Sequence, residues 1–303
     1  MPDLKKILLL PVMVLFVLNC GGEPPANSPD DGNTGLPPFP PTSGGDQGGN
    51  DIPIAGNGGC SASSSVDYSE AGPYKFTTTR SGSYEVYLPT ATADCNRFPL
   101  IGFSLGTAMP AFNYTSYFRH FASWGYVVAI DPSNLLNLGG GSLKTMLSQV
   151  RSDNRIAGNL NEKTGIIGHS QGGAAVVNVA MGNNPRIDAV VGLMPALFTG
   201  TGSISGAGLF LGGTSDLFSV ATDPQGPYNK TSGPAFIGDV QGAGHNTGLL
   251  GGGSNRSFQS ASAAWFRCYL SGDANACSKF EQSARNKKCV FPGTWAKCEG
   301  KNL

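Results

Sequence analysis

The sequence is poor in charged residues. Asp, Glu, Lys and Arg make up 13% of its 303 residues, against roughly 25% in an average globular protein. The 20 basic residues balance the 20 acidic ones, so the chain lacks the basic surplus that is typical of nucleic-acid-binding proteins. Because 40% of the residues are hydrophobic, the chain can still bury a sizeable core. We therefore expect a globular protein with no nucleic-acid partner.

The N-terminus lacks an apolar run long enough to cross a membrane as a helix. Its apolar run, residues 7–18, has 12 residues, whereas a transmembrane helix needs about 20. Lys5 and Lys6 precede it, as in a secretory signal peptide. The run ends in VLNCG, which resembles the lipobox of bacterial lipoproteins, where the cysteine is lipidated. We predict a lipoprotein-type signal peptide at 1–20 with Cys20 lipidated; the alternative is ordinary secretion, with Cys20 as a leftover thiol.

Residues 21–59 have no Lys, no Arg and no apolar periodicity. They contain 11 Gly and 8 Pro in 39 positions, and such a segment cannot bury enough surface to offset its chain entropy. We expect a disordered tether that holds a globular domain, residues 60–303, off a membrane surface. The expected location is the bacterial cell envelope, lipid-anchored at the outer membrane, or the medium if the protein is secreted.

Seven cysteines in a chain so poor in charge indicate a protein outside the cytosol. The six that follow Cys20 allow 15 pairings, but two local pairs each close a loop of about ten residues, which stabilises a fold by about 2–3 kcal/mol. A zinc site is the alternative, and it is disfavoured because the sequence has no C-x-x-C and no nearby His. The predicted disulfides are Cys60–Cys95, Cys268–Cys277 and Cys289–Cys298.

Apolar strand patterns alternate with helical patterns along the predicted domain. The strand runs are almost continuously apolar, which is typical of a parallel sheet covered on both faces. We therefore predict an α/β fold with a mostly parallel central sheet and helices on both faces. The expected strands are 84–88, 99–104, 126–130, 165–168, 189–194, 209–212 and 235–240, and the expected helices are 113–124, 142–157, 172–181 and 260–270.

The sequence Gly168-His169-Ser170-Gln171-Gly172 matches the G-x-S-x-G pattern. It lies between an apolar strand and a helix of small residues, the setting of a sharp turn that exposes a nucleophilic serine. At the start of a helix, the macrodipole favours developing negative charge. We therefore predict that Ser170 is a catalytic nucleophile.

The scarcity of histidine identifies the base that Ser170 needs. The chain has three histidines; His120 precedes Ser170 among aromatic residues and reads as a packed or surface residue, and His169 is adjacent to Ser170 across the turn. Since the chain order in this type of site is Ser, acid, His, the base is predicted to be His245.

The acid is then one of four aspartates, because no Glu lies between Ser170 and His245. Asp216 follows the strand LFLGG and is placed at the carboxyl edge of the sheet, where catalytic groups gather. Asp223 is the reserve candidate. Asp188 precedes its strand and Asp239 lies within one, so both are disfavoured.

Two backbone N–H groups are needed to stabilise an oxyanion. The first is predicted to be that of Gln171, directly after the nucleophile. The second belongs to the loop after the strand PLIGFS, where Thr107 is the preferred donor and Leu105 the competitor. No metal and no cofactor are expected, since H-E-x-x-H is absent.

Residues 75–280 resemble the α/β-hydrolases of the cutinase-like polyester hydrolase group, relatives of dienelactone hydrolases, chlorophyllases and platelet-activating-factor acetylhydrolases. The resemblance rests on TGIIGHSQGGAA, LFLGGTSDLFSV, GAGHNTG and the segment PLIGFSLGTAMP. It implies an α/β-hydrolase fold, a triad of Ser170, Asp216 and His245, and an oxyanion hole at Thr107 and Gln171. The tail 281–303 extends past the resemblance.

Together these patterns predict a secreted serine carboxylic ester hydrolase that acts on small-molecule or polymeric esters. Its reaction is expected to pass through an acyl-enzyme intermediate. We expect a monomer that meets the membrane through its lipid anchor alone. Two other functions remain open: a catalytically silent binding module with the same fold, and an acyltransferase.

Overall fold

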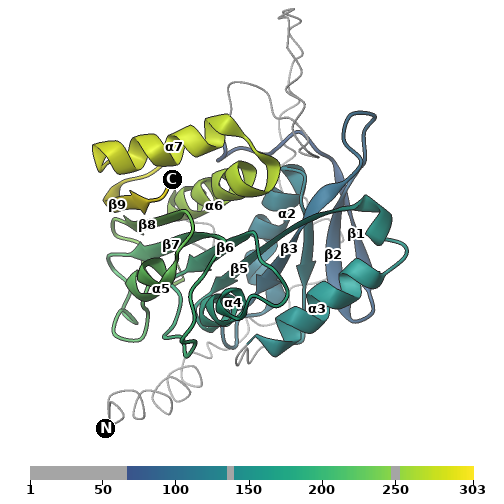
Figure 1. Ribbon diagram of the computed structural model, residues 1–303, viewed down its shortest axis with the longest axis horizontal. Helices are drawn as coiled ribbons and strands as arrows, with labels where there is room; N and C mark the ends of the chain where they lie inside the picture. Colours follow the sequence, from purple (N-terminus) through teal and green to yellow (C-terminus); the bar gives the residue numbers. More distant parts are fainter. Residues whose placement is uncertain (1–66, 135–139, 247–252) are drawn as a thin grey trace, which may run out of the picture. The chain divides into compact units, whose positions relative to one another are not determined.

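The computed structural model describes residues 67–134, 140–246 and 253–303, with residues 253–255 described by their backbone alone (Figure 1). The chain divides into two units, Met1–Gly56 and Asn57–Leu303, and every described residue belongs to the second. The expected signal peptide 1–20 with Cys20, the tether 21–59 and Cys60 lie outside the described residues.

Nine strands form one sheet in the order β1-β2-β4-β3-β5-β6-β7-β8-β9 (Figure 1). The six strands from β4 to β8 in this order pair in parallel, whereas β1, β2 and β9 join antiparallel at the two sides. The strands are β1 (Phe76–Ser81), β2 (Tyr84–Pro89), β3 (Phe98–Ser104), β4 (Val127–Ile130), β5 (Leu160–His169), β6 (Ala189–Leu193), β7 (Ala207–Gly213), β8 (Ala235–Val240) and β9 (Trp295–Lys301).

Helices cover both faces of the sheet. Figure 1 shows α2 and α6 on one face, with α7 packed outside α6, and α3, α4 and α5 on the other. None of the helices in the described part of the chain is long and apolar enough to span a membrane. The helices are η1 (Ala111–Tyr114), α2 (Thr115–Ser123), α3 (Gly141–Ser152), η2 (Ala157–Asn159), α4 (Gln171–Gly182), α5 (Gln225–Lys230), α6 (Gly253–Ser271) and α7 (Ala274–Asn286).

The parallel strands supply side chains to two separate cores because successive residues of a strand point to opposite faces. In β3, Ile101 and Phe103 pack in the core beneath α2 and α6, while Leu100 packs in the core beneath α3 and α4. In β7, Leu209 packs in the core beneath α2 and α6, and Phe210 packs in the core beneath α3 and α4. Burial on both faces explains why these strands read as continuous apolar runs, and it confirms the predicted α/β class with a mostly parallel sheet.

Two expected helix boundaries were wrong. The helix expected over 142–157 ends at Ser152, because the carboxylate of Asp153 accepts the backbone N–H of Arg155 and competes with the helical hydrogen bonds. The helix expected over 260–270 begins earlier, at Gly253.

The C-terminal tail is an integral part of the sheet. After α7 the chain turns back as β9, which pairs antiparallel with β8. Disulfides join Cys268 of α6 to Cys277 of α7, and Cys289 to Cys298 of β9, as predicted. Cys95 is buried and disulfide-bonded, while its predicted partner Cys60 lies outside the described residues. Disulfides of this kind are typical of proteins that fold in an oxidising compartment, outside the cytosol.

His120 on α2 is a packed histidine. Its imidazole is buried, and Nε2 lies 3.0 Å from the carbonyl oxygen of Tyr68. Burial lowers the pKa of His120 to about 4, although the Tyr68 carbonyl and the Asp67 carboxylate act in the opposite direction. The imidazole is therefore neutral in the folded protein above about pH 4. In the unfolded chain it takes up a proton near its usual pKa of about 6.5.

We predict that His120 makes the protein lose stability as the pH falls from about 6.5 to about 4, because the unfolded state binds the proton first. The shift corresponds to roughly 3 kcal/mol in the free energy of unfolding. His120→Gln keeps an N–H donor for Tyr68 and does not titrate. Urea denaturation at pH 7 and pH 4 should therefore show a smaller acid loss for the variant than for the wild type. Equal losses would contradict the prediction.

Candidate active site

Ser170 occupies the sharp turn between β5 and α4. Its backbone has φ 54° and ψ −120°, a conformation that residues other than glycine rarely adopt. Three backbone hydrogen bonds hold it there: its N–H donates to Leu193, and its carbonyl accepts from Ala174 and Ala196. The turn is thus fixed by both its own helix and the end of the neighbouring strand β6.

The glycines of the G-x-S-x-G pattern are required by close backbone packing. A Cβ on Gly168 would collide with the carbonyl of Gly172 across the turn. A Cβ on Gly172 would collide with the carbonyl oxygens of Ser104, the last residue of β3, and of Leu105, the residue after it. The start of α4 therefore lies directly against the loop after β3.

Three of the predicted residues meet at the carboxyl edge of the sheet. His245, in the loop after β8, has its Nε2 2.9 Å from Ser170 Oγ. Its Nδ1 lies 3.0 Å from Oδ2 of Asp216, which follows β7. Since a carboxylate only accepts, Nδ1 carries the proton, and Nε2 is left to accept the Ser170 hydroxyl. The arrangement is that of a serine nucleophile, a base and an acid that orients the base.

Asp216 is held as a carboxylate. Its Oδ1 accepts the backbone N–H of Phe218 at 2.8 Å, and its Oδ2 accepts the Thr222 hydroxyl at 3.3 Å. Burial by itself raises the pKa of Asp216, but the hydrogen bonds from His245, Phe218 and Thr222 outweigh it, so that the pKa lies below the usual value. The negative charge opposite His245 is therefore maintained.

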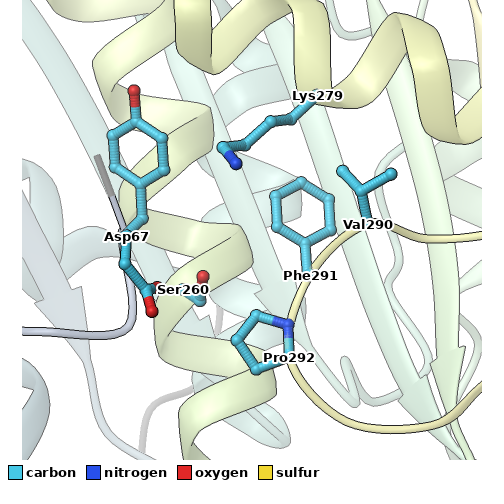
Figure 2. Close-up of a pocket in the computed structure, with 7 residues that line it drawn as sticks. Asp67, Ser260, Lys279, Val290, Phe291 and Pro292 are labelled. Atoms are coloured by element: carbon cyan, nitrogen blue, oxygen red, sulfur yellow. The ribbon is translucent and has the colours of Figure 1, made fainter. Parts of the chain in front are cut away.

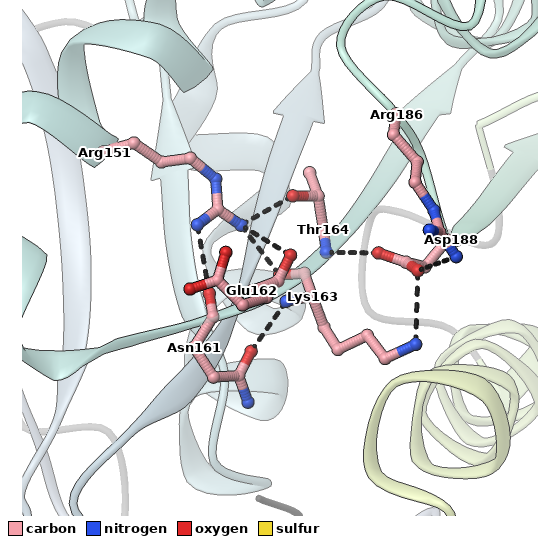
Figure 3. Close-up of polar contacts among 7 residues, drawn as sticks. All are labelled: Arg151, Asn161, Glu162, Lys163, Thr164, Arg186 and Asp188. Atoms are coloured by element: carbon pink, nitrogen blue, oxygen red, sulfur yellow. Dashed lines mark hydrogen bonds and ion pairs between the residues drawn. The ribbon is translucent and has the colours of Figure 1, made fainter. Parts of the chain in front are cut away.

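Asp223 and Asp188, two of the other candidates for the acid, are engaged elsewhere. Asp223, the reserve candidate, accepts the backbone N–H of Gly226 at 2.7 Å in the first turn of α5. Asp188 lies at the opposite edge of the sheet from Ser170, just before β6. Figure 3 shows its carboxylate among the backbone N–H of Thr164 and the side chains of Lys163 and Arg186. Arg151 of α3 donates to the same stretch of β5, so this cluster joins the amino ends of β5 and β6.

The structure brings together the two segments that are predicted to form the oxyanion hole. Gln171 is the first residue of α4, directly after Ser170. The loop after β3 packs on the same turn, since a Cβ on Gly106 would meet the His169 ring. The N–H of Gly106 itself is engaged, because it donates to the Tyr114 hydroxyl at 3.0 Å. Thr107, the next residue, and its competitor Leu105 stay the predicted donors from this loop.

Two aromatic contacts of the site were not predicted. The Phe218 ring packs against His245, with ring centroids 4.9 Å apart. The buried ring of His169 also lies beside His245, with ring centroids 4.8 Å apart. No local pattern in the sequence could have identified Phe218, because its partner lies 27 residues further along the chain.

A cavity of about 330 Å³ lies away from this site, beside α6 and α7 (Figure 2). No triad residue lines it. It is bordered by Asp67, Tyr68, Ser260, Lys279, Val290, Phe291 and Pro292. Within the described residues, no group of three His, Cys, Asp or Glu side chains is arranged to hold a metal ion.

Comparison with known proteins assigns no family. No protein-family model matches this chain, and no curated protein matches it significantly. The chemistry of the site therefore has to be inferred from its own geometry.

We predict that Gly172→Ala is strongly destabilising, because the added methyl group meets two backbone carbonyls that cannot rotate away. Overpacking of this kind costs about 1–3 kcal/mol or more. Gly141→Ala is a matched control, since Gly141 also lies in the first turn of a helix and its Cβ would meet nothing within 4 Å. Thermal unfolding should show a lower Tm for Gly172→Ala and an unchanged or slightly higher one for Gly141→Ala. Equal Tm values would contradict the packing argument.

Proposed function

We propose that this protein is an exported serine hydrolase of carboxylic esters with an α/β-hydrolase fold. The observation that carries the proposal is the hydrogen-bonded series Ser170–His245–Asp216 at a strained strand-to-helix turn. Further support comes from the chain order Ser, Asp, His and from the packing of the loop after β3 on the nucleophile turn, both of which are features of α/β-hydrolases.

In the proposed reaction, His245 Nε2 takes the hydroxyl proton of Ser170 as Oγ attacks the ester carbonyl carbon. Asp216 stabilises the imidazolium that forms. The tetrahedral oxyanion accepts hydrogen bonds from the backbone N–H groups of Gln171 and Thr107. Each donor stabilises the transition state by about 3 kcal/mol. When the C–O bond to the alcohol breaks, His245 returns the proton to the leaving alkoxide, and an acyl-serine remains.

Water then completes the cycle. His245 removes a proton from the water as its oxygen attacks the acyl carbon, and a second tetrahedral intermediate forms. Its collapse breaks the bond to Ser170 Oγ, which regains its proton from His245. The carboxylic acid is released, and the resting state of the site is restored.

Exposed apolar side chains support an ester with apolar groups as the substrate. Among the described residues, four of the five exposed large hydrophobic side chains belong to the connections that follow β3, β6 and β7 at the carboxyl edge of the sheet, where Ser170 lies. Leu217 and Val220 follow Asp216 by one and four residues in the chain and are 93% and 76% exposed. The other two are Phe112, after β3, and Leu197, after β6. Exposed apolar side chains at this edge of the sheet are what a surface that binds the apolar groups of an ester would present.

Export and lipid anchoring through Cys20 are part of the proposal. They are supported by the charge and apolar pattern of residues 1–20 and by the two disulfides.

We predict that Ser170→Ala abolishes hydrolysis of p-nitrophenyl esters, because no nucleophile remains. Asp216→Asn should lower kcat by about four orders of magnitude, since the amide no longer fixes the Nδ1–H tautomer of His245. Ser219→Ala is the matched control, because Ser219 is an exposed serine in the loop after β7. Turnover should be measured together with mass-spectrometric detection of phosphonate labelling at Ser170. A folded wild type with neither turnover nor labelling would refute the proposal.

We also predict that replacing Leu217 and Val220 together by Ser raises KM for long-chain esters about tenfold or more. The expected loss follows from the transfer free energy of the two side chains. The acetyl ester, which reaches fewer apolar contacts, should be hydrolysed at nearly the wild-type rate. Val290→Ser is the control, since Val290 is exposed but borders the distant cavity. An equal loss on short and long esters would argue against an apolar substrate surface.

A further inference from the structure

A series of three hydrogen bonds runs beside the triad. The N–H of Gly106 donates to the Tyr114 hydroxyl at 3.0 Å, and this hydroxyl lies 2.9 Å from His169 Nδ1. His169 Nε2 in turn lies 3.0 Å from the backbone carbonyl oxygen of His245. The side chains of Tyr114 and His169 are both buried, so these contacts are made out of water.

The partners of the series determine the tautomer of His169. A carbonyl oxygen only accepts, so Nε2 carries the proton that is donated to His245. In the neutral imidazole, Nδ1 is then bare and accepts the hydroxyl proton of Tyr114. The Tyr114 oxygen keeps a lone pair for the N–H of Gly106. Every donor in the series therefore has one acceptor, which is the arrangement expected for buried polar groups.

We propose that His169, kept as its neutral Nε2–H tautomer by Tyr114, is a positioning residue that fixes the loop of the base against the loop of the oxyanion hole. The proposal rests on the proposed esterase function. His169 directly precedes the nucleophile, Gly106 directly precedes the predicted donor Thr107, and the carbonyl that His169 holds belongs to the base itself. One imidazole thus joins three segments that are remote in the sequence, and it acts through the groups that it holds in place.

The charge state of His169 is suited to this place. Burial, together with the neighbouring His245, lowers the pKa of His169 to about 3, against the opposing effects of the hydrogen bond to the His245 carbonyl and of Asp216. Tyr114 is neutral as well, since burial raises its pKa. His169 therefore stays uncharged when His245 becomes an imidazolium during the reaction. A second cation 4.8 Å from that ring would oppose proton transfer from Ser170.

The first arm of the test removes one atom of the series. Tyr114→Phe deletes the hydroxyl and keeps the ring, and we expect kcat to fall about tenfold to a hundredfold with KM within twofold of wild type, because the catalytic groups lose their alignment. Phosphonate labelling of Ser170 should slow in parallel. Tyr126→Phe is the control: it removes another buried hydroxyl, one that contacts Ser271 outside the site.

A pair of His169 variants tests the donor to His245. The amide of His169→Gln offers an N–H in a position similar to Nε2, whereas His169→Leu offers none. We expect Gln to retain several-fold more kcat than Leu, a rescue that a packing role alone would not give. Equal kcat values for the two variants would overturn the positioning role, as would a Tyr114→Phe protein that has wild-type kcat.

The second arm of the test determines the tautomer of His169 by NMR spectroscopy and does not depend on a measurement of enzymatic activity. The chain has three histidines, so the ¹⁵N signals of their rings can be assigned in full-length wild type and in Ser170→Ala with the help of His120→Gln and His169→Gln. We expect His169 to show a protonated Nε2 and a bare Nδ1 that do not change from pH 8 to pH 5. An Nδ1–H tautomer, or titration of His169 in this range, would overturn the proposal even if the esterase is active. An inactive wild type with the expected tautomer would instead refute the proposed function, and with it the catalytic role of the series.

Discussion

The backbone of Ser170 is the constraint around which the site is built. A serine at positive φ costs on the order of 1–3 kcal/mol, and it persists only where the surroundings leave no alternative. Here the ends of β5 and β6, the first turn of α4 and the loop after β3 are all fitted to the same turn. The strain at one residue is thus offset by backbone hydrogen bonds and by close packing that glycine alone allows.

Much of this could be predicted from the sequence because it depends on local patterns. The strand runs, the turn at Ser170 and the identity of His245 follow from apolar periodicity, from a five-residue motif and from the scarcity of histidine. Asp216 could be chosen because the carboxyl ends of parallel strands meet at one edge of a sheet. The structure confirms the mostly parallel α/β sheet and the two local disulfides, and it brings Ser170, His245 and Asp216 within hydrogen-bonding distance.

What escaped prediction depends on contacts between distant segments. The tail gave no recognisable pattern, because β9 is a polar strand that is defined by its pairing with β8 rather than by its own composition. Tyr114 belongs to no motif and lies within the helix expected over 113–124, and His169 was noted only as the residue adjacent to Ser170 across the turn. Their hydrogen bonds join positions 55 and 76 residues apart, which no spacing rule within one element can reveal.

The pairing of β9 with β8 also determines what the sheet presents to other molecules. Without the tail, β8 would leave the apolar run Ala235–Val240 as an unpaired edge, a template on which another chain could add a strand. With it, the outermost strand carries the charges of Lys297, Glu299 and Lys301, while on the far side β1 is rich in threonine. The border formed by β9 is thus a poor partner for sheet extension. The pairing of the tail with β8 would in this way limit aggregation of the protein through its own strands.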